Sequence, residues 1–252
     1  MLDVLPPETL LGEFRTGLWL PHYPHIRRGD WALRHIRMAA APGYWRQHYT
    51  VAGTVLLLGP GRNGPVSWMS LTPSEIESQT IGLEGAHGHT VVAGMGMGWL
   101  AANAALKPEV DHVTVVERNE DVLALIAEAG IFAQLPQIAR RKIEIVTADA
   151  LEYRPSAPVD TLQADIWERL TEAGKCADIR RMQDHIGAAS LYFWGQEMEI
   201  WRAALKRSLQ TLDWDSVHDI VEQDIALPLI LPAWPDYPEK IAAAAQWWFR
   251  PD

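Results

Sequence analysis

The stretch from His89 to Glu117 reads HTVVAGMGMGWLAANAALKPEVDHVTVVE and decides the fold class of this chain. Thr90 to Ala93 is a short run rich in β-branched residues, which is typical of a buried parallel strand. Trp99 to Lys107 is rich in Ala and Leu and stops before Pro108, which predicts a helix. Val113 to Val116 predicts a second buried strand. The order of strand, glycine turn, helix and strand indicates an α/β nucleotide-binding unit.

Three glycines, Gly94, Gly96 and Gly98, separate the first strand from the helix. A turn this rich in glycine lets the backbone approach a ligand closely, because no Cβ stands in the way. Glu117 ends the second strand, where a carboxylate can accept hydrogen bonds from ribose hydroxyls. The spacing is GxGxG, whereas a dinucleotide fingerprint is GxGxxG, and Trp99 stands where that fingerprint has Gly or Ala. A dinucleotide site and a tight turn without a ligand are therefore the alternatives to another nucleotide-type site.

The GxGxG spacing, with an acid at the end of the next strand, resembles motif I of the class I S-adenosylmethionine (SAM) methyltransferases. The resemblance implies an α/β fold with a doubly wound, Rossmann-like methyltransferase sheet. It also implies SAM as cofactor, with S-adenosylhomocysteine as its product. In that family the glycines face the methionine part of SAM, the acid binds the ribose and a later Asp reads the adenine. Carried over residue by residue, the resemblance implies cofactor contacts at Gly94, Met95, Gly96, Gly98, Glu117, Arg118, Asp149 and Ala150.

The third and fourth predicted strands span Ile143 to Val146 and Val159 to Ala164, and candidate catalytic acids follow the fourth. Ligands of open α/β sheets bind outside the carboxyl ends of the strands, where Asp165 and Glu168 come next. In the resembling families an acid here faces the reactive nitrogen, and spermidine synthases carry a D-x-x-D pattern of which these two residues are a D-x-x-E version. A carboxylate here would accept a hydrogen bond from an attacking amine and help to remove its proton. Asp165 is also a candidate cofactor contact, and its structural alternative is the N-cap of a following helix.

A second resemblance spans Val66 to Asn119, with the segments VSWMSLTP, AGMGMG and VVERN. These resemble guanidinoacetate N-methyltransferase and its arginine-methylating relatives over about a quarter of the chain. The resemblance implies cofactor contacts at Met69 and Thr72. The guanidine-binding Glu of that family is Ser70 here, which speaks against a guanidine substrate. From the residues alone, Thr72 and Glu75 predict a capping box at the start of a helix.

Residues 1–80 are predicted to form an N-terminal extension that covers the cleft, and 81–252 the SAM-binding domain. Asp30 to Ala41 is interpreted as an amphipathic helix. His48 to Leu58 and Pro65 to Met69 predict a β-hairpin, an element that spermidine synthases also carry before their nucleotide-binding domain. Residues 1–50 hold six Arg against four acids. This favours a solvated helical face, with an RNA-binding surface as the alternative.

Composition limits the function classes. A length of 252 residues with 48% hydrophobic and 21% charged residues is ordinary for a globular protein. No apolar run approaches the ~20 residues of a membrane span, the first residues lack the features of a signal peptide, and a single Cys176 excludes an internal disulfide. Cytoplasmic localisation is expected. The net charge of −10 argues against nucleic acid as the main partner.

Further along the chain, Ser190 to Gly195 predicts a fifth strand, and no clear signal marks a sixth or seventh. The scattered histidines do not predict a metal site, because zinc requires three or four ligands at suitable spacing. The apolar, Trp-rich tail suits a homodimer contact. Together these features predict a SAM-dependent methyltransferase acting on a small molecule, with a nitrogen acceptor favoured. An aminopropyltransferase of the spermidine synthase kind and a SAM-binding protein without catalysis are the alternatives, although Met97 stands where spermidine synthases carry an Asp.

Overall fold

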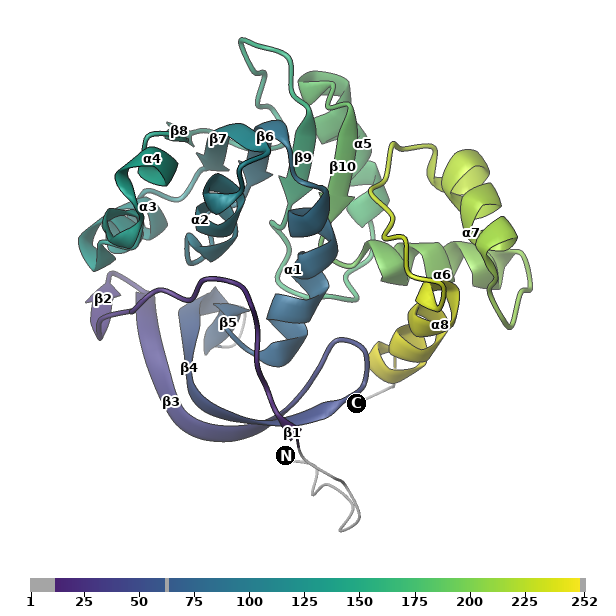
Figure 1. Ribbon diagram of the computed structural model, residues 1–252, viewed down its shortest axis with the longest axis horizontal. Helices are drawn as coiled ribbons and strands as arrows, with labels where there is room; N and C mark the ends of the chain where they lie inside the picture. Colours follow the sequence, from purple (N-terminus) through teal and green to yellow (C-terminus); the bar gives the residue numbers. More distant parts are fainter. Residues whose placement is uncertain (1–11, 62–63, 250–252) are drawn as a thin grey trace.

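Two five-stranded sheets form the framework of the protein (Figure 1). The computed structural model describes residues 12–61 and 64–249. The N-terminal sheet contains β1 (Gly12–Glu13), β2 (Ile26–Arg28), β3 (Trp31–Pro42), β4 (His48–Gly61) and β5 (Gly64–Ser70). The second sheet contains β6 (Gly88–Ala93), β7 (Val110–Glu117), β8 (Ile143–Thr147), β9 (Thr161–Ala164) and β10 (Ser190–Phe193). The N-terminal sheet lies below the second sheet in Figure 1.

The second sheet confirms the predicted α/β, Rossmann-like architecture. Its strands run in the order β10-β9-β6-β7-β8, and every neighbouring pair is parallel. Side chains of a strand alternate between the two faces of a sheet. Val92 accordingly lies in one hydrophobic cluster, whereas Val91 and Ala93 lie in the other. The two clusters therefore cover opposite faces, as in a doubly wound fold.

Helices pack on both faces. The cluster around Val92 includes α2 (Trp99–Leu106), α3 (Glu120–Ala129) and α4 (Gln137–Arg140), with the 3-10 turn η1 (Phe132–Gln134) beside them. The cluster around Val91 includes α5 (Lys175–Ile186), α6 (Gln196–Lys206), α7 (Trp214–Ile220) and α8 (Tyr237–Trp248). A π-helical turn, η2 (Val221–Ile225), continues α7. Within the described ranges, no helix is long and apolar enough to cross a membrane.

The interpretation of Asp30 to Ala41 as a helix is wrong. This segment forms β3, which pairs antiparallel with β4 from Ala32 opposite Leu58 to Pro42 opposite His48. Trp31 and Leu33 are buried, whereas Arg34 and Arg37 are exposed. Pairing with a long neighbouring strand outweighs the helical propensity of an Ala-rich run. The arginines therefore lie on a curved sheet and form no helical face. The predicted hairpin of β4 and β5 is confirmed.

The helix α1 (Pro73–Gly85) begins where predicted, but its predicted capping box does not form. The hydroxyl of Thr72 lies 2.8 Å from the Ser70 hydroxyl and 3.2 Å from that of Ser74, and it accepts no bond from the helix backbone. The Glu75 side chain is only 9% exposed and turns into the protein. The first turn of α1 is packed between the two sheets, so the Glu75 side chain lies in the interior of the protein and does not cap the helix.

The carboxyl-terminal part adds little to the parallel sheet. The segment LPLILP places Leu229 beside Leu191 in a single parallel bridge, with a 2.7 Å bond from Ile230 N to Leu191 O. Among the described residues this bridge is all that exists of a sixth strand, and a seventh is absent. The parallel sheet therefore ends at β10.

Candidate active site

A cavity of about 410 Å³ lies where the carboxyl ends of the parallel strands meet the N-terminal sheet. Its volume is within the usual range of small-molecule sites. One wall comes from the loops that follow β6, β7, β8 and β9, and the opposite wall includes Trp31, Leu57, Pro60, Trp68 and Met69. Trp31 and Trp68 have ring centroids 5.7 Å apart. Neither tryptophan can be identified as a site residue from the sequence, because the Trp31 segment predicts a helix and Trp68 is one of twelve tryptophans.

The glycine loop forms the centre of the cavity wall, and two of its residues leave no room for a side chain. Gly94 has φ 98°, and a Cβ there would lie 2.3 Å from the backbone oxygen of Asp165. Gly96 has φ 49°, and a Cβ there would lie 2.4 Å from the sulfur of Met69. That sulfur also accepts a 3.1 Å bond from the backbone N–H of Met97. Met69 thus fixes the loop from the opposite wall.

The other members of the loop support it from behind. Gly98 precedes the first residue of α2 with φ 73°, and a Cβ there would lie 3.3 Å from Ile126 and 3.2 Å from Phe132. Gly98 therefore permits close packing of α2 and is not among the residues that line the cavity. The Met95 side chain is buried and also does not line it. Met97 is fully buried, in agreement with an apolar rather than a ligand-binding side chain at this position.

Glu117 links the glycine loop to the end of β7. Its Oε2 accepts a 3.0 Å bond from Met95 N, and its Oε1 accepts a 2.7 Å bond from Asn119 N. The carboxylate is half-buried and lines the cavity. Because each carboxylate oxygen can accept more than one hydrogen bond, both oxygens keep capacity for a ligand hydroxyl. Asn119 also caps α3, as its position predicts.

Asp149, Ala150 and Arg118 lie together at one end of the cavity. Asp149 Oδ1 accepts a 3.0 Å bond from Leu151 N, so this residue does cap the turn that follows β8. Its Oδ2 lies 3.3 Å from Arg118 NH1, and the Arg118 side chain is 74% exposed. The pair forms the solvent edge of the cavity, with Ala150 buried behind it.

Asp165 lies at the carboxyl end of β9 and lines the cavity. The interpretation of Asp165 as a helix N-cap is wrong, because the next helix, α5, begins only at Lys175. Its Oδ2 accepts a 2.8 Å bond from Gln79 Nε2 of α1. Burial raises the pKa of Asp165 to about 7, while the Lys175 charge and the Gln79 bond oppose that rise. A carboxyl with this pKa can exchange a proton near neutral pH.

Besides Met95 and Gly98, two further predicted site residues lie outside the cavity. Glu168 is only 3.9 Å from Arg169 and is not among the lining residues. Thr72 is occupied by the neighbouring serine hydroxyls and also does not line the cavity. Neither residue touches the space that Asp165 faces.

Three tryptophans follow strand ends and play different parts. Trp99 is completely buried and donates through its indole N–H to Trp19 O at 2.8 Å, which is a packing role. Trp167 lines the cavity and donates to Asp178 Oδ2 at 2.9 Å. Trp194 donates to Ser78 Oγ at 3.1 Å.

Within residues 12–61 and 64–249, no group of three or more His, Cys, Asp or Glu is placed to hold a metal ion.

The chain matches no family model and no curated protein. Among solved structures, it is similar to a DhpI–SAM–HEP complex, with 14% identity, a TM-score of 0.36, and coverage of 49% of this chain and 56% of that one. It is similar to the 23S rRNA methyltransferase ErmE with 19% identity, a TM-score of 0.32, and coverage of 43% and 40%. It is similar to the methyltransferase domain of bacterial CtHen1 with 16% identity, a TM-score of 0.33, and coverage of 43% and 58%. The chain thus spans about half the length of these proteins. The functional assignment therefore rests on the geometry of the cavity.

Proposed function

We propose that this protein is a SAM-dependent methyltransferase that acts on a small molecule through a nitrogen atom. The main support for this proposal is the set of groups that line one cavity at the carboxyl ends of the parallel strands. A loop without Cβ atoms at Gly94 and Gly96, the Glu117 carboxylate, Asp149 and Asp165 follow four successive parallel strands of the sheet. Open α/β sheets bind their ligands at this edge.

The cavity residues suit the parts of SAM in turn. Gly94 and Gly96 would admit the amino acid end against the backbone, and Glu117 would accept bonds from the ribose hydroxyls. Asp149 and Ala150 would face the adenine. Trp31 and Trp68 of the N-terminal sheet lie across the cavity from these groups, which supports a covering role for residues 1–80. SAM supplies an electrophilic methyl group and its own leaving group, so the protein needs only to position the acceptor and remove a proton.

Asp165 is the group that would act on the acceptor. A carboxylate that accepts a bond from an amine N–H orients the nitrogen lone pair toward the methyl group. The same carboxylate can take the proton that the nitrogen loses, because a base with a pKa near the working pH transfers protons efficiently. A nitrogen acceptor is favoured because acids predominate in the cavity lining. Among the described residues, Glu117, Asp149, Asp165 and Asp178 line it together with one cation, Arg118.

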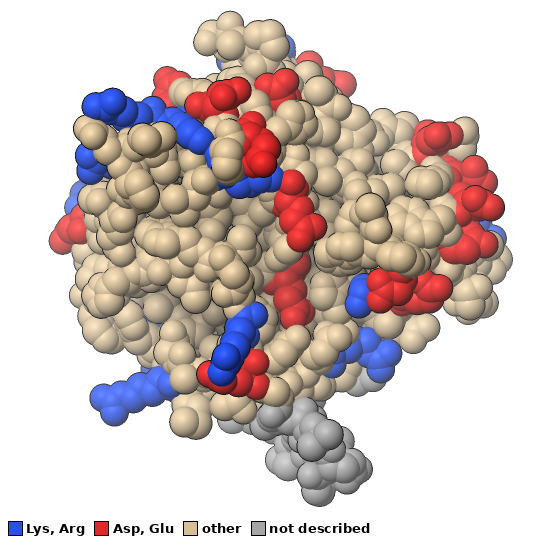
Figure 2. Space-filling view, viewed as in Figure 1, with Lys and Arg blue, Asp and Glu red and all other residues tan. Residues whose placement is uncertain are grey.

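A small molecule is favoured over RNA by the charge of the protein. The net charge is −10, and residues 212–252 hold eight acids against two bases. Figure 2 shows acidic side chains gathered at the end of the molecule that carries α7. A phosphate backbone is bound through basic surfaces, so this distribution supports an acceptor that is not a nucleic acid.

The rate of methyl transfer is expected to rise with pH through about 7, because only the ionised form of Asp165 can accept the proton. The folded-state pKa of Asp165 is raised, so the carboxylate is protonated and inactive below that value and ionised above it. The measurement is the pH dependence of kcat at saturating SAM and acceptor. A rate that falls as pH rises through 7 would contradict the role of Asp165 as a base.

Methyl transfer can be followed directly with SAM labelled with ¹³C at the methyl group. The purified protein is incubated with a panel of primary and secondary amines, and with alcohols and carboxylates as matched acceptors. The expected result is an N–CH3 resonance with formation of S-adenosylhomocysteine. Release of methylthioadenosine from decarboxylated SAM would instead establish aminopropyl transfer. An O–CH3 product would contradict the nitrogen acceptor.

A further inference from the structure

We propose that Lys175 is a positioning residue, the buried counter-ion that keeps the Asp165 carboxylate ionised and able to accept a proton from the acceptor. This inference rests on the function proposed above, and it adds to that function a residue that does not line the cavity. The burial of Lys175 cannot be predicted from the sequence, because lysine side chains are usually exposed to solvent.

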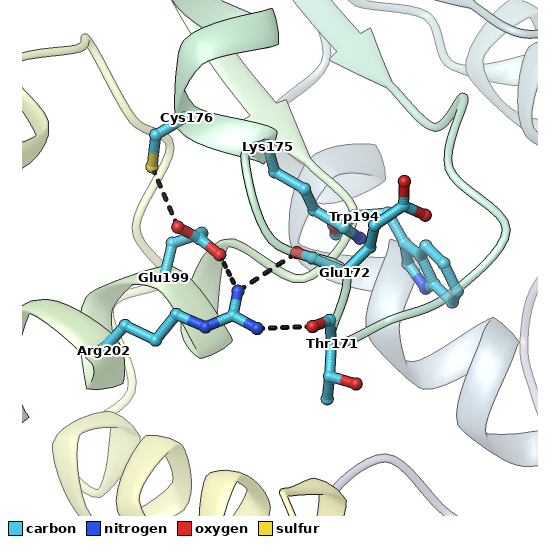
Figure 3. A network of polar contacts seen from close by, with 7 residues as sticks. All are labelled: Thr171, Glu172, Lys175, Cys176, Trp194, Glu199 and Arg202. Carbon is cyan, nitrogen blue, oxygen red and sulfur yellow. Dashed lines mark hydrogen bonds and ion pairs between the residues drawn. The ribbon is translucent and has the colours of Figure 1, made fainter.

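Lys175 is the first residue of α5 and is completely buried. Its ammonium donates to the backbone oxygen of Trp194 at 2.9 Å (Figure 3). It also lies 4.8 Å from the ring centroid of Trp167 and 4.4 Å from that of Trp194. Two indole faces and one carbonyl hold the charge in one place by cation–π attraction and a hydrogen bond. The Trp167 side chain that contacts the ammonium also lines the cavity, so Lys175 lies one side chain away from it.

The backbone leaves room for this ammonium. Gly195 has φ 85°, and a Cβ there would lie 3.2 Å from Lys175 Nζ and 2.9 Å from Leu170 O. Any larger residue would press on the position that the ammonium occupies. A buried cation is costly unless nearby negative charge compensates it. No ion pair within 4.0 Å involves Lys175 among the described residues, so the compensation must come from carboxylates at longer range.

Glu199 and Glu172 are poor candidates for this compensation. Glu199 of α6 forms an ion pair with Arg202, and the Cys176 thiol donates to it at 3.4 Å (Figure 3). Arg202 also donates to the backbone oxygens of Thr171 and Glu172, which fixes it beside Glu199 (Figure 3). The side chain of Glu172 is exposed, so water screens its charge. The Arg202 charge itself lowers the pKa of Lys175.

The remaining carboxyls are Asp165 and Glu75, which belong to one buried group. Burial, followed by the Asp165 charge, raises the pKa of Glu75 well above its usual range, which favours its neutral form. The phenol of Tyr192 on β10 donates to the backbone oxygen of Ser78, and burial raises its pKa well above its usual value, so it adds no charge near Asp165. Backbone contacts place Asp165 near the ammonium: Trp194, whose oxygen accepts from Lys175, donates its own N–H at 2.9 Å to the oxygen of Ala164, the residue before Asp165.

Each of the two charges stabilises the ionised form of the other group. Burial lowers the pKa of Lys175 to about 8, and the Asp165 charge opposes that fall. Burial raises the pKa of Asp165 to about 7, and the Lys175 charge opposes that rise. Each charge therefore favours the ionised form of the other, with Asp165 lining the cavity and Lys175 completely buried. Loss of the ammonium must therefore raise the pKa of Asp165 and reduce the carboxylate at neutral pH.

The test is Lys175→Met, which removes the charge and keeps an unbranched side chain of similar length. The pKa of Asp165 is read from the ¹³C carboxyl resonance that disappears in Asp165→Asn. The expected result is a higher titration midpoint in Lys175→Met, with no change in Lys206→Met, whose lysine is exposed on α6. A rise of one unit reduces the ionised fraction at pH 7 roughly fivefold, so kcat should fall by that factor at pH 7 and recover at pH 9.

A second variant covers the case in which Lys175→Met does not fold. In Asp165→Asn the ¹³Cε resonance of Lys175 should titrate at a lower pH than in the wild type, because coupling between two groups is reciprocal. An unchanged Asp165 midpoint in Lys175→Met, or an unchanged Lys175 midpoint in Asp165→Asn, would overturn the proposal. The NMR midpoints do not depend on turnover. A protein without methyl transfer would thus refute the proposed function, whereas unchanged midpoints would refute this inference alone.

Discussion

Replacing Asp165 by Asn is expected to reduce kcat by roughly 10²–10⁴-fold, the usual contribution of a general acid or base. The amide cannot take a proton from the attacking nitrogen. Its size and its contact with Gln79 are otherwise close to those of the acid, because an Asn oxygen can accept the same 2.8 Å bond. SAM affinity is therefore expected to stay close to that of the wild type. The measurements are steady-state kinetics with the acceptor and calorimetric titration with SAM.

Glu168→Gln is the matched control for this prediction. Glu168 lies three residues further along the same loop, but it does not line the cavity and its neighbour is Arg169. We expect turnover and SAM affinity to be unchanged. Full turnover in Asp165→Asn, or a large loss of turnover in Glu168→Gln, would show that Asp165 is not the catalytic acid. Loss of SAM binding in Asp165→Asn would show that Asp165 serves the cofactor rather than the acceptor.

Replacing Gly94 by Ala is expected to reduce methyl transfer about 100-fold or more, since displacing a reactive group by 1 Å can cost that much. The added Cβ would lie 2.3 Å from the backbone oxygen of Asp165, so the glycine loop and the catalytic acid cannot both keep their positions. The φ of 98° adds strain of about 1–2 kcal/mol for a residue with a Cβ. Stability is measured by urea unfolding, and cofactor affinity by calorimetry.

Gly130→Ala separates backbone strain from the clash. Gly130 ends α3 with φ 65°, and a Cβ there meets no atom within 4 Å. This variant should lose stability of about 1–2 kcal/mol and keep SAM affinity and turnover. Equal effects of the two substitutions on SAM affinity would contradict the view that the backbone at Gly94 borders the ligand. Unimpaired transfer in Gly94→Ala would contradict it directly.

The parallel sheet could be predicted from the sequence because its signals are local. Buried parallel strands are short apolar runs, and the glycines from Gly94 mark the turn after the first of them. The acids that follow the strands were predictable for the same reason. The carboxyl ends of parallel strands meet at one edge, so Glu117, Asp149 and Asp165 had to converge there.

Apart from the β4–β5 hairpin, the N-terminal sheet and the surroundings of Asp165 could not be predicted in this way. The strand β3 is Ala-rich, and only its pairing with β4 makes it extended. Glu75 and Gln79 lie four residues apart on α1, which puts them on one helix face. Whether that face meets water or a buried aspartate depends on long-range packing. Lys175 and Trp194 meet across two separate segments, a contact that no local pattern reports.

Calorimetric titration of the purified protein with SAM, S-adenosylhomocysteine, decarboxylated SAM and NAD decides whether the cavity is a SAM site. We predict that the first two bind, that decarboxylated SAM binds more weakly and that NAD does not bind. Glu117→Ala should weaken SAM about tenfold or more through the loss of hydrogen bonds to a charged group. Glu144→Ala, on the exposed surface of β8, should leave the affinity for SAM unchanged. Binding of NAD alone, or equal SAM affinity in Glu117→Ala and the wild type, would contradict the account.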